Sequence, residues 1–269
     1  MFVITGATGN VGRHVVAELL DAGHKVRALS RDPATAALPD GTEVARTADL
    51  PLEGATGVLL NPAAFWNGVD ELLDRARQAG VRRIVVLSSS AVLAGEGNPI
   101  GDHHLAVERQ VEATGLEWTH LRPGAFAANA LGWADQIRGN GVVRGPHARA
   151  HTVPIDERDI AAVAARALTG DDLVGTRPEL SGPESLTFAD QARIIGEAIG
   201  RPVTYEELSP EAARAAMTYA PEPVVDALLT FWAEAVDRPQ PVSSEVERIT
   251  GRPARTFAEW AADHVRDFA

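Results

Sequence analysis

Three glycines, Gly6, Gly9 and Gly12, follow an apolar run at the start of the chain and precede apolar residues at helical spacing. This pattern predicts a strand, a tight turn and a helix. The first glycine permits the turn, the second lets the backbone approach a pyrophosphate, and the third lets the helix pack closely on the strand. Free N–H groups at the helix N-terminus then face the anion. We predict a dinucleotide site contacted by Gly6, Thr8, Gly9, Asn10, Val11 and Gly12.

The residues that follow the next apolar run indicate which dinucleotide binds. Residues 25–30 predict a second strand, and Ser30, Arg31 and Asp32 stand at its end. An acidic side chain here binds the ribose 2′-hydroxyl of NAD, whereas an arginine meets the 2′-phosphate of NADP. Arg31 comes first and its guanidinium matches phosphate geometry, while Asp32, followed by Pro33, could cap the next turn. We therefore predict NADP(H) rather than NAD(H), with Ser30 and Arg31 as contacts.

Polar side chains that could act beside such a cofactor follow at Ser88, Ser89 and His104. Hydride transfer to a carbonyl or quinone leaves charge on oxygen, which needs a proton or a hydrogen bond. Imidazole titrates near pH ~6.5, so His104 could bind a ribose hydroxyl or pass a proton, and Glu108 one turn on could orient it. We predict Ser89 and His104 as catalytic, with Ser88 and His104 also contacting the cofactor. The alternatives are serines that satisfy their own turn and an exposed His104–Glu108 pair.

Aromatic residues follow two predicted strand ends and could line an apolar pocket over the nicotinamide. One pair follows an Asn-Pro dipeptide and the other an Arg-Pro-Gly segment. The predicted substrate contacts are Phe65, Trp66, Phe126 and Trp133. The predicted cofactor contacts in the preceding turns are Asn61, Pro62, Pro123 and Gly124. The alternative for each aromatic residue is a place in the hydrophobic core, which is the commoner fate of such side chains.

The elements that must position these residues alternate between strands and helices. Apolar runs at 58–60 and 84–87 predict buried strands, and a further strand is predicted at 117–121. Helices are predicted at 69–76, ended by Gly80, and at 105–114, ended by Gly115. Such alternation gives a Rossmann-type doubly wound parallel sheet of the α/β class. Residues 45–58 are too few for a crossover helix, so we expect a short coil there.

The second half of the chain becomes mainly helical. Asp156 is the predicted N-cap of a helix that Gly170 ends, and Ser209 precedes another helix. Two capping boxes are predicted, at Thr187 with Asp190 and at Thr256 with Glu259. One final helix should bury a face made of Phe257, Trp260, Ala261, His264, Val265 and Phe268. The helix that carries residues 224–232 is interpreted as packing, and its apolar face is either core or a homodimer interface.

These patterns divide the chain into a nucleotide-binding part and a smaller, mainly helical C-terminal lobe. We predict an NAD(P)-binding Rossmann domain formed by residues 1–125 and 150–181. Residues 126–149 and 182–269 are predicted to form the lobe on the substrate side. The lobe should pack on the carboxyl ends of the strands, where open α/β sheets bind ligands.

Composition excludes several classes of function. The formal charge of −12 at pH 7 argues against nucleic acid and anionic membrane surfaces. The lack of cysteine excludes disulfides and thiolate metal sites, and suits a reducing cytoplasm. Asp102, His103, His104 and Glu108 could suggest a metal site, but no third ligand cluster appears elsewhere in the chain, so we predict no metal. Because the first strand begins at Phe2 and no membrane span is evident, we expect a cytoplasmic protein.

Several segments together resemble one family over nearly the whole chain. They are TGATGNVG, ALSRDP, AGVRR before VVLSSS, EWTHLRPGAF and SGPESLTFAD. In combination they are similar to the NmrA-like group of atypical short-chain dehydrogenases. The resemblance implies a Rossmann fold that binds NAD(P)H, with a substrate cleft beneath a C-terminal lobe. It also implies that one of the serines lies near the nicotinamide. Members include quinone and isoflavone-type reductases and proteins that only sense redox state.

The chain departs from the usual Tyr-x-x-x-Lys pair of short-chain dehydrogenases. Ile100 and His104 stand at those positions, and the tyrosines, Tyr205 and Tyr219, lie in the predicted lobe. We predict an NADP(H)-dependent oxidoreductase acting on a flat hydrophobic carbonyl, quinone or enone, aromatic polyketides included, without that pair. The alternatives are a non-catalytic NADP(H) sensor and a biosynthetic enzyme that performs no net reduction.

Overall fold

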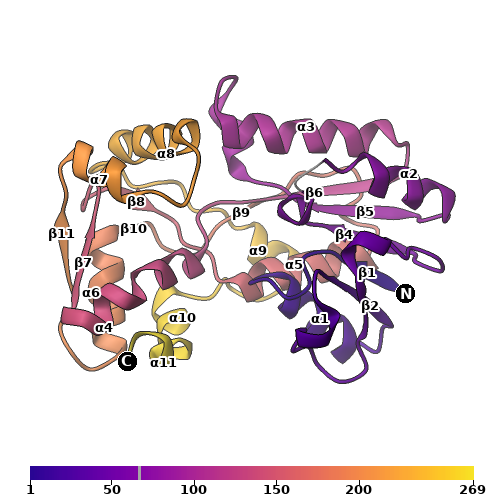
Figure 1. Ribbon diagram of the computed structural model, residues 1–269, viewed down its shortest axis with the longest axis horizontal. Coiled ribbons are helices and arrows are strands. Elements are labelled where there is room, and N and C mark those ends of the chain that lie inside the picture. Colours follow the sequence, from indigo (N-terminus) through magenta and orange to yellow (C-terminus); the bar gives the residue numbers. More distant parts are fainter. Residues whose placement is uncertain (66–67) are drawn as a thin grey trace.

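The computed structural model describes residues 1–65 and 68–269 and is built around one twisted parallel sheet (Figure 1). Its strand order is β3-β2-β1-β4-β5-β6-β9, and every neighbouring pair is parallel. The strands are β1 (Phe2–Ile4), β2 (Val26–Ser30), β3 (Glu43–Arg46), β4 (Gly57–Leu60), β5 (Arg83–Leu87), β6 (Glu117–Pro123) and β9 (Glu179–Leu180). β2 and β3 are added on one side of β1, and β4 to β6 and β9 are added on its other side. The strand order therefore reverses between β1 and β4.

Helices cover both faces of this sheet. On one face, α1 (Gly12–Asp21) packs beside α5 (Glu157–Thr169), and their side chains share a core cluster with β1. On the other face, α2 (Asp70–Gln78) and α3 (Pro99–Ala113) contribute to a second cluster. The doubly wound Rossmann prediction is confirmed. Between β3 and β4 the chain makes only a short 3-10 turn at Thr47–Asp49, as expected for so few residues.

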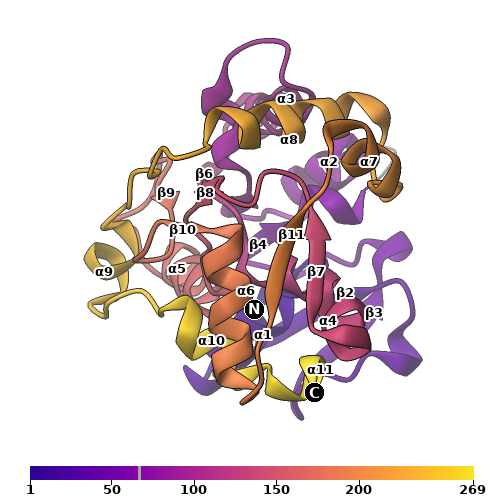
Figure 2. The ribbon, with the colours of Figure 1, turned by 90° about the vertical axis from the view of Figure 1, so that its left-hand side faces the viewer.

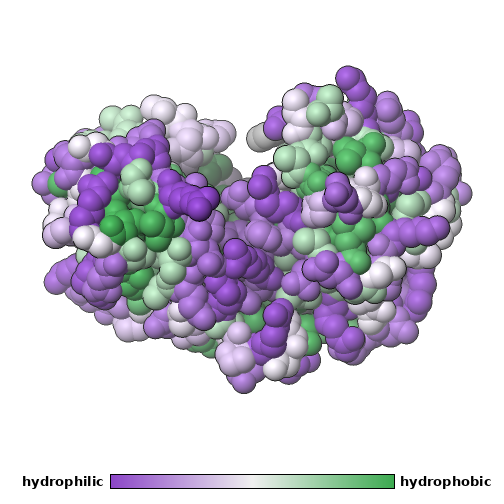
Figure 3. Space-filling view, turned by 90° about the horizontal axis from the view of Figure 1, so that it is seen from below, coloured by the Kyte–Doolittle hydropathy of each residue, from purple (hydrophilic) through white to green (hydrophobic). Residues whose placement is uncertain are grey.

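The second part of the molecule holds most of the remaining elements (Figures 1 and 2). Its helices are α4 (Ala134–Asn140), α6 (Phe188–Ala198), α7 (Pro210–Ala216), α8 (Glu222–Glu234), α10 (Phe257–Asp263) and α11 (Val265–Phe268). Two small strand pairs, absent from the prediction, join β7 (Val142–Gly145) to β11 (Thr204–Glu207) and β8 (His151–Thr152) to β10 (Leu186–Thr187). Figure 3 shows the surface hollowed between the two parts of the molecule.

The helix α9 (Glu245–Thr250) lies in the sequence of the predicted C-terminal lobe but packs with the parallel sheet and its helices. It packs on α5, and its Val246 and Ile249 join the core cluster of α1 and β1. A stretch from the predicted lobe therefore completes the core of the sheet. No helix in residues 1–65 or 68–269 is both long and apolar enough to cross a bilayer.

Local capping signals correctly predicted the starts of α5, α6, α7 and α10. Both predicted capping boxes, Thr187 with Asp190 and Thr256 with Glu259, are formed. Asp156 caps α5 and Ser209 caps α7, each accepting a backbone N–H of its helix. These side chains satisfy donors that the first turn of a helix leaves free.

Two helix boundaries differ from the prediction. α3 begins at Pro99, before the predicted 105, because the Asn98 side chain accepts the N–H groups of Ile100 and Gly101. The predicted final helix is broken at His264 into α10 and α11. His264 leaves helical geometry, and its ring Nδ1 donates to the Trp260 carbonyl at 2.8 Å.

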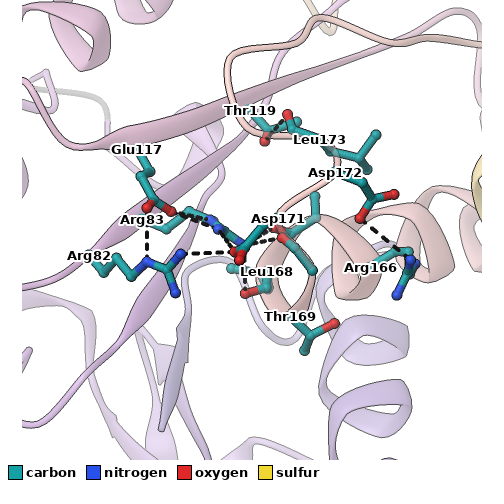
Figure 4. Close-up of polar contacts among 12 residues, drawn as sticks. Arg82, Arg83, Glu117, Thr119, Arg166, Leu168, Thr169, Asp171, Asp172 and Leu173 are labelled. Atoms are coloured by element: carbon teal, nitrogen blue, oxygen red, sulfur yellow. Dashed lines mark hydrogen bonds and ion pairs between the residues drawn. The ribbon is translucent and has the colours of Figure 1, made fainter.

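At the amino ends of the strands, Arg83 ties α5 to the sheet (Figure 4). Its side chain is buried, with 3% exposure, and its Nη1 donates to the carbonyls of Ala167 and Gly170 at the end of α5. Its Nη2 donates to Glu117 and Asp171, each at 2.6 Å. The guanidinium thus satisfies carbonyls that a helix C-terminus leaves free. This anchor lies at the end of the sheet opposite the crevice.

At the other end of α5, Asp159 makes folding sensitive to pH. Burial raises the pKa of Asp159 to about 6, against an ordinary value of 3.8, although its carboxylate accepts the Arg255 N–H. Because the folded state favours the protonated form, stability from this group is lost as pH rises from about 4 to about 6.

Asp159→Asn is therefore expected to raise the free energy of unfolding by about 2 kcal/mol at pH 7 to 8, since an amide can still accept the Arg255 N–H. Urea unfolding at pH 4 and at pH 7.5 measures the effect, which should vanish at the lower pH. Asp135→Asn is the control, because that side chain is 96% exposed in the first turn of α4. A pH-independent change in Asp159→Asn would contradict the explanation.

Candidate functional site

The predicted cofactor turns of β1 and β4 meet at the point where the strand order reverses. Gly6 follows β1 and Asn61 follows β4, and these strands are neighbours in the sheet. A Cβ added at Gly6 would lie 2.8 Å from the Asn61 side-chain nitrogen. The Thr5 hydroxyl joins the two turns, because it donates to the Leu59 carbonyl at 2.9 Å and accepts the Asn61 N–H at 2.8 Å. Ligands of open α/β sheets bind in the crevice at such a point.

The glycine turn has the geometry that close backbone approach requires. Gly6 has a φ of +62°, a region that favours glycine. A Cβ at Gly12 would lie 2.2 Å from the Gly6 carbonyl oxygen, which no side chain can tolerate. Thr8, Gly9 and Asn10 are exposed, so the turn is open to a ligand. These residues form a cradle that would hold the pyrophosphate of NAD(P)H.

One candidate residue of this turn was missed in the sequence. The Arg13 side chain donates to the Thr8 carbonyl at 2.7 Å and to the Gly9 carbonyl at 3.4 Å. Its exposed guanidinium therefore lies on the turn itself and brings a positive charge beside the predicted pyrophosphate position. The available signal was a basic residue directly after the third glycine.

At the end of β2, the structure separates the roles of three neighbouring residues. The Asp32 carboxylate accepts the Ala34 N–H and the Thr35 hydroxyl, which matches its interpretation as a turn cap. The Ser30 hydroxyl is buried in the same turn, where it donates to the Asp32 carbonyl. Arg31 is exposed. Of the two charged side chains, Asp32 is hydrogen-bonded within the turn, whereas Arg31 makes no hydrogen bond to it.

The predicted serines have partners within the fold. Ser88 is buried, and its hydroxyl donates to Glu108 at 2.6 Å. Ser89 caps the 3-10 helix Ser90–Ala94 by accepting the Ala91 N–H. Ser89 thus satisfies its own turn, which is the alternative given for these serines, whereas Ser88 is bonded to a side chain of α3.

A buried ion pair lies beneath Ser88 at the carboxyl end of β6. Glu108, 1% exposed, accepts Arg122 Nε at 2.9 Å and Nη2 at 2.5 Å. Burial alone would raise the pKa of the Glu108 carboxyl, but hydrogen bonds from Arg122 and Ser88 hold it below its ordinary value. The expectation that Glu108 orients His104 is wrong, because both carboxylate oxygens are bonded to Arg122.

His104 lies partly buried on α3, and its Nδ1 has no hydrogen-bond partner among the described residues. Burial first, and the neighbouring His103 second, lower the pKa of His104 to about 4. The expectation of titration near neutral pH is therefore wrong. At physiological pH the ring is neutral and can donate a hydrogen bond, but it holds no second proton to transfer.

An aromatic cavity of about 530 Å³ opens beside the carboxyl end of β6. Its walls come from the 3-10 helix η5 (Ala127–Trp133), the two small strand pairs, α6, α7 and α8. The predicted Phe126 and Trp133 both line it, and an aromatic cluster forms much of its wall. That cluster comprises Trp133, Phe188, Tyr205 and Trp232.

Other predicted aromatic residues have different fates. Phe65 packs against the core cluster of β4, α2 and α3 and does not line the cavity, so the alternative of a core residue applies. Trp66 lies outside the described residues. On α8 the interpretation as packing is wrong in part, because Trp232 lines the cavity and Phe231 is 45% exposed.

A group of metal-ligating side chains does occur, at a place other than the one considered in the sequence. Atoms of Glu108, Glu112 and His120 lie within 4.8 Å of one another. Glu112 accepts Arg177 at 2.6 Å, and Glu108 is bonded to Arg122. The two guanidinium groups already balance these carboxylates, so the arrangement is an ion-pair cluster.

Comparison with known proteins identifies the family. A model of an NAD(P)H-binding family matches residues 6–171, which include the glycine turn, Arg31, the serines and His104. The chain belongs to this NAD(P)H-binding family, and it shares its fold with NmrA. The prediction that the chain binds NAD(P)H is confirmed.

Several relatives match almost end to end. The (4-alkanoyl-5-oxo-2,5-dihydrofuran-3-yl)methyl phosphate reductase of Streptomyces griseus is 38% identical, over 100% of this chain and 99% of its own. The NAD(P)H azoreductase of Xenophilus azovorans is 35% identical, with the same coverage. An NADPH-dependent quinone oxidoreductase of Escherichia coli, solved with NADPH, superposes with a TM-score of 0.81 at 26% identity, covering 98% of this chain and 99% of its own. These relatives agree with the predicted class of NAD(P)H-dependent oxidoreductase.

Proposed function

We propose that this protein reduces a flat, hydrophobic carbonyl, quinone or enone with NADPH. The observation that carries the proposal is the aromatic cavity beside the carboxyl end of β6, in a chain whose glycine turn fits a dinucleotide. Cavities of this size and lining bind small apolar ligands. The relatives named above reduce a furanone phosphate, azo compounds and quinones, which supports an acceptor of this chemical kind.

The mechanism rests on positioning. NADPH, when bound, supplies a hydride. The glycine turn and the first turn of α1 would hold the pyrophosphate. Arg31 would bind the 2′-phosphate, and His104 would bind a ribose hydroxyl. Phe126 and Trp133 would hold the flat acceptor between them in a fixed orientation. The acceptor gains the hydride with its two electrons and one proton from solvent, since the chain has neither the usual tyrosine nor a protonated His104 at neutral pH.

Arg31→Gln is expected to raise the Kd for NADPH by about tenfold or more, because it removes a charge-assisted bond to the 2′-phosphate. The Kd for NADH should change little, since NADH lacks that phosphate. Isothermal titration with both cofactors measures the difference. Equal losses for the two cofactors, or tighter binding of NADH by the natural protein, would reject the role of Arg31.

His104→Ala is expected to raise the KM for NADPH by roughly fivefold, the value of one hydrogen bond. Because the pKa of His104 is about 4, the pH profile of kcat between pH 5.5 and 8 should keep its shape in the variant. His103→Ala is the matched control, as that ring is exposed beside it. If the natural enzyme titrates near pH 6.5 and His104→Ala does not, His104 transfers a proton after all.

The decisive experiment mixes the purified protein with NADPH and a panel of quinones, enones and azo compounds, and follows the loss of nicotinamide absorbance. Oxidation of NADPH with aromatic acceptors supports the enzyme. Tight binding of NADPH without turnover across the panel supports the non-catalytic sensor. The domain boundaries, the homodimer and the cytoplasmic location stay predictions.

A further inference from the structure

Several polar side chains of the cavity wall are already bonded to other groups of the protein. Gln191 Nε2 donates to the Thr152 hydroxyl at 2.9 Å, and the Tyr205 hydroxyl donates to the Pro146 carbonyl at 2.9 Å. Burial raises the pKa of Tyr205 well above its ordinary value, so this hydroxyl stays neutral. Arg144, also on the wall, pairs with Glu206 at 2.8 Å. These groups do not require a polar partner on the ligand.

One polar side chain near the strand end differs from them. Asn129 lines the cavity on η5, just beyond Phe126, and is exposed. Its backbone N–H donates to the Phe126 carbonyl, while its side-chain amide has no hydrogen bond within residues 1–65 and 68–269. An amide in this place can donate to one carbonyl oxygen of a ligand.

The backbone beside Asn129 is held in place by a buried carboxylate. Buried Glu157, at the start of α5, accepts the Ala128 N–H at 2.7 Å and Trp260 Nε1 at 3.1 Å. The turn that carries Asn129 is thereby held to both the sheet and the C-terminal helices. The end of the cavity that carries the Asn129 amide is therefore held in place by these hydrogen bonds.

The far end of the cavity is mainly apolar. Its side chains come from the loop after β11, from α7 and the loop that follows it, and from α8, and Tyr219 brings one hydroxyl to this end. The apolar side chains are those of Leu208, Ala213, Ala216, Met217 and Leu228. α8 also contacts α3, the helix that bears His104, so this end and the crevice share a boundary. An apolar ligand segment buried here gains free energy with each methylene.

We propose that the substrate is an amphiphile with a conjugated carbonyl head and an alkyl tail. The head lies at Asn129 and Phe126, next to the strand end, and the tail runs between α7 and α8. This inference rests on the proposed function, because it assigns the orientation of the same acceptor in the same cavity.

The test is a series of 2-alkyl-1,4-benzoquinones with methyl, butyl and heptyl chains, assayed with NADPH. The kcat/KM should rise by roughly threefold per added methylene until the cavity is filled. Ala213→Leu places a larger side chain at the apolar end, since Ala213 is buried on the cavity wall. It should remove the gain from butyl to heptyl and leave the methyl compound within twofold. Ala216→Leu serves the same purpose if Ala213→Leu does not fold.

Ala215→Leu is the matched control, because Ala215 lies on the same helix, is exposed and does not line the cavity. It should keep the full dependence on chain length. No dependence in the natural protein, or the same dependence in Ala213→Leu and Ala215→Leu, overturns the proposal. Quenching of tryptophan fluorescence by the same series measures binding without turnover, since Trp133 and Trp232 line the cavity. If the protein binds compounds with longer tails more tightly but oxidises no NADPH, the inference about the tail is supported and the proposed reductase activity is rejected.

Discussion

Gly12→Ala is expected to abolish useful NADPH binding, with a Kd at least about 100-fold higher, or about 2.7 kcal/mol. The new Cβ would stand 2.2 Å from the Gly6 carbonyl oxygen and 2.8 Å from the Ala7 Cα. Both neighbours are backbone, so the clash is relieved only if α1 moves away from β1. Such a movement spreads the N–H groups that face the pyrophosphate. Overpacking of this kind also lowers the free energy of unfolding by about 1 to 3 kcal/mol.

The matched control is Gly139→Ala in α4, where an added Cβ meets no atom within 4 Å. Because alanine favours the helix, this variant should be as stable as the natural protein or slightly more so, and should bind NADPH normally. Fluorescence titration of NADPH and thermal unfolding measure both properties. If Gly12→Ala binds NADPH within a few-fold of the natural protein, the turn is not the cofactor cradle.

Arg122→Leu is expected to lower the free energy of unfolding by about 3 to 5 kcal/mol at neutral pH, because it leaves a buried carboxylate without its counter-charge. Glu108 is 1% exposed and would keep only the Ser88 hydroxyl as a donor. In the natural protein the pKa of Glu108 is lowered in the folded state, so the stabilisation is present above pH about 4.5 and lost as pH falls through the folded pKa. Without Arg122, burial should raise that pKa, so the variant should recover part of its loss in acid.

Two further variants separate this effect from general damage. The double variant Glu108→Leu with Arg122→Leu removes both charges and should be more stable than Arg122→Leu alone. Arg193→Leu breaks the exposed pair with Glu197 on α6 and should change stability by only about 0.5 kcal/mol. Urea unfolding at pH 4 and pH 7.5 measures all of them. A double variant less stable than Arg122→Leu at pH 7.5 would show that the charge of Glu108 is not the cause.

The local signals in the sequence were sufficient to predict most strands and helices around the parallel sheet and the glycine turn, but not the two small strand pairs. Gly6 and Gly12 are required by contacts within the turn itself, and Gly80 and Gly115 follow their helices with positive φ, as predicted. The capping boxes form between residues only three positions apart. Such features depend on near neighbours along the chain, so residue type and spacing decide them.

The chemistry at the strand ends was decided by tertiary structure. Ser88 reaches Glu108 on α3, and both depend on Arg122 of β6, a partnership of three separate elements. His104 was correctly placed on a helix, yet its burial, which lowers its pKa to about 4, comes from packing that the sequence does not display. Phe65 and Phe126 both follow strands and both pack against a core cluster, but of the two only Phe126 also lines the cavity.

The sequence by itself thus determined the fold class, the NAD(P)H-binding family and the glycine turn after β1, because short-range geometry and motif spacing encode them. The cavity was determined only in three dimensions. Its wall joins Phe126, Thr152, Phe188, Tyr205 and Trp232, which come from separate elements of the chain. Whether a side chain faces solvent, core or ligand depends on what packs against it, and those neighbours are distant in sequence.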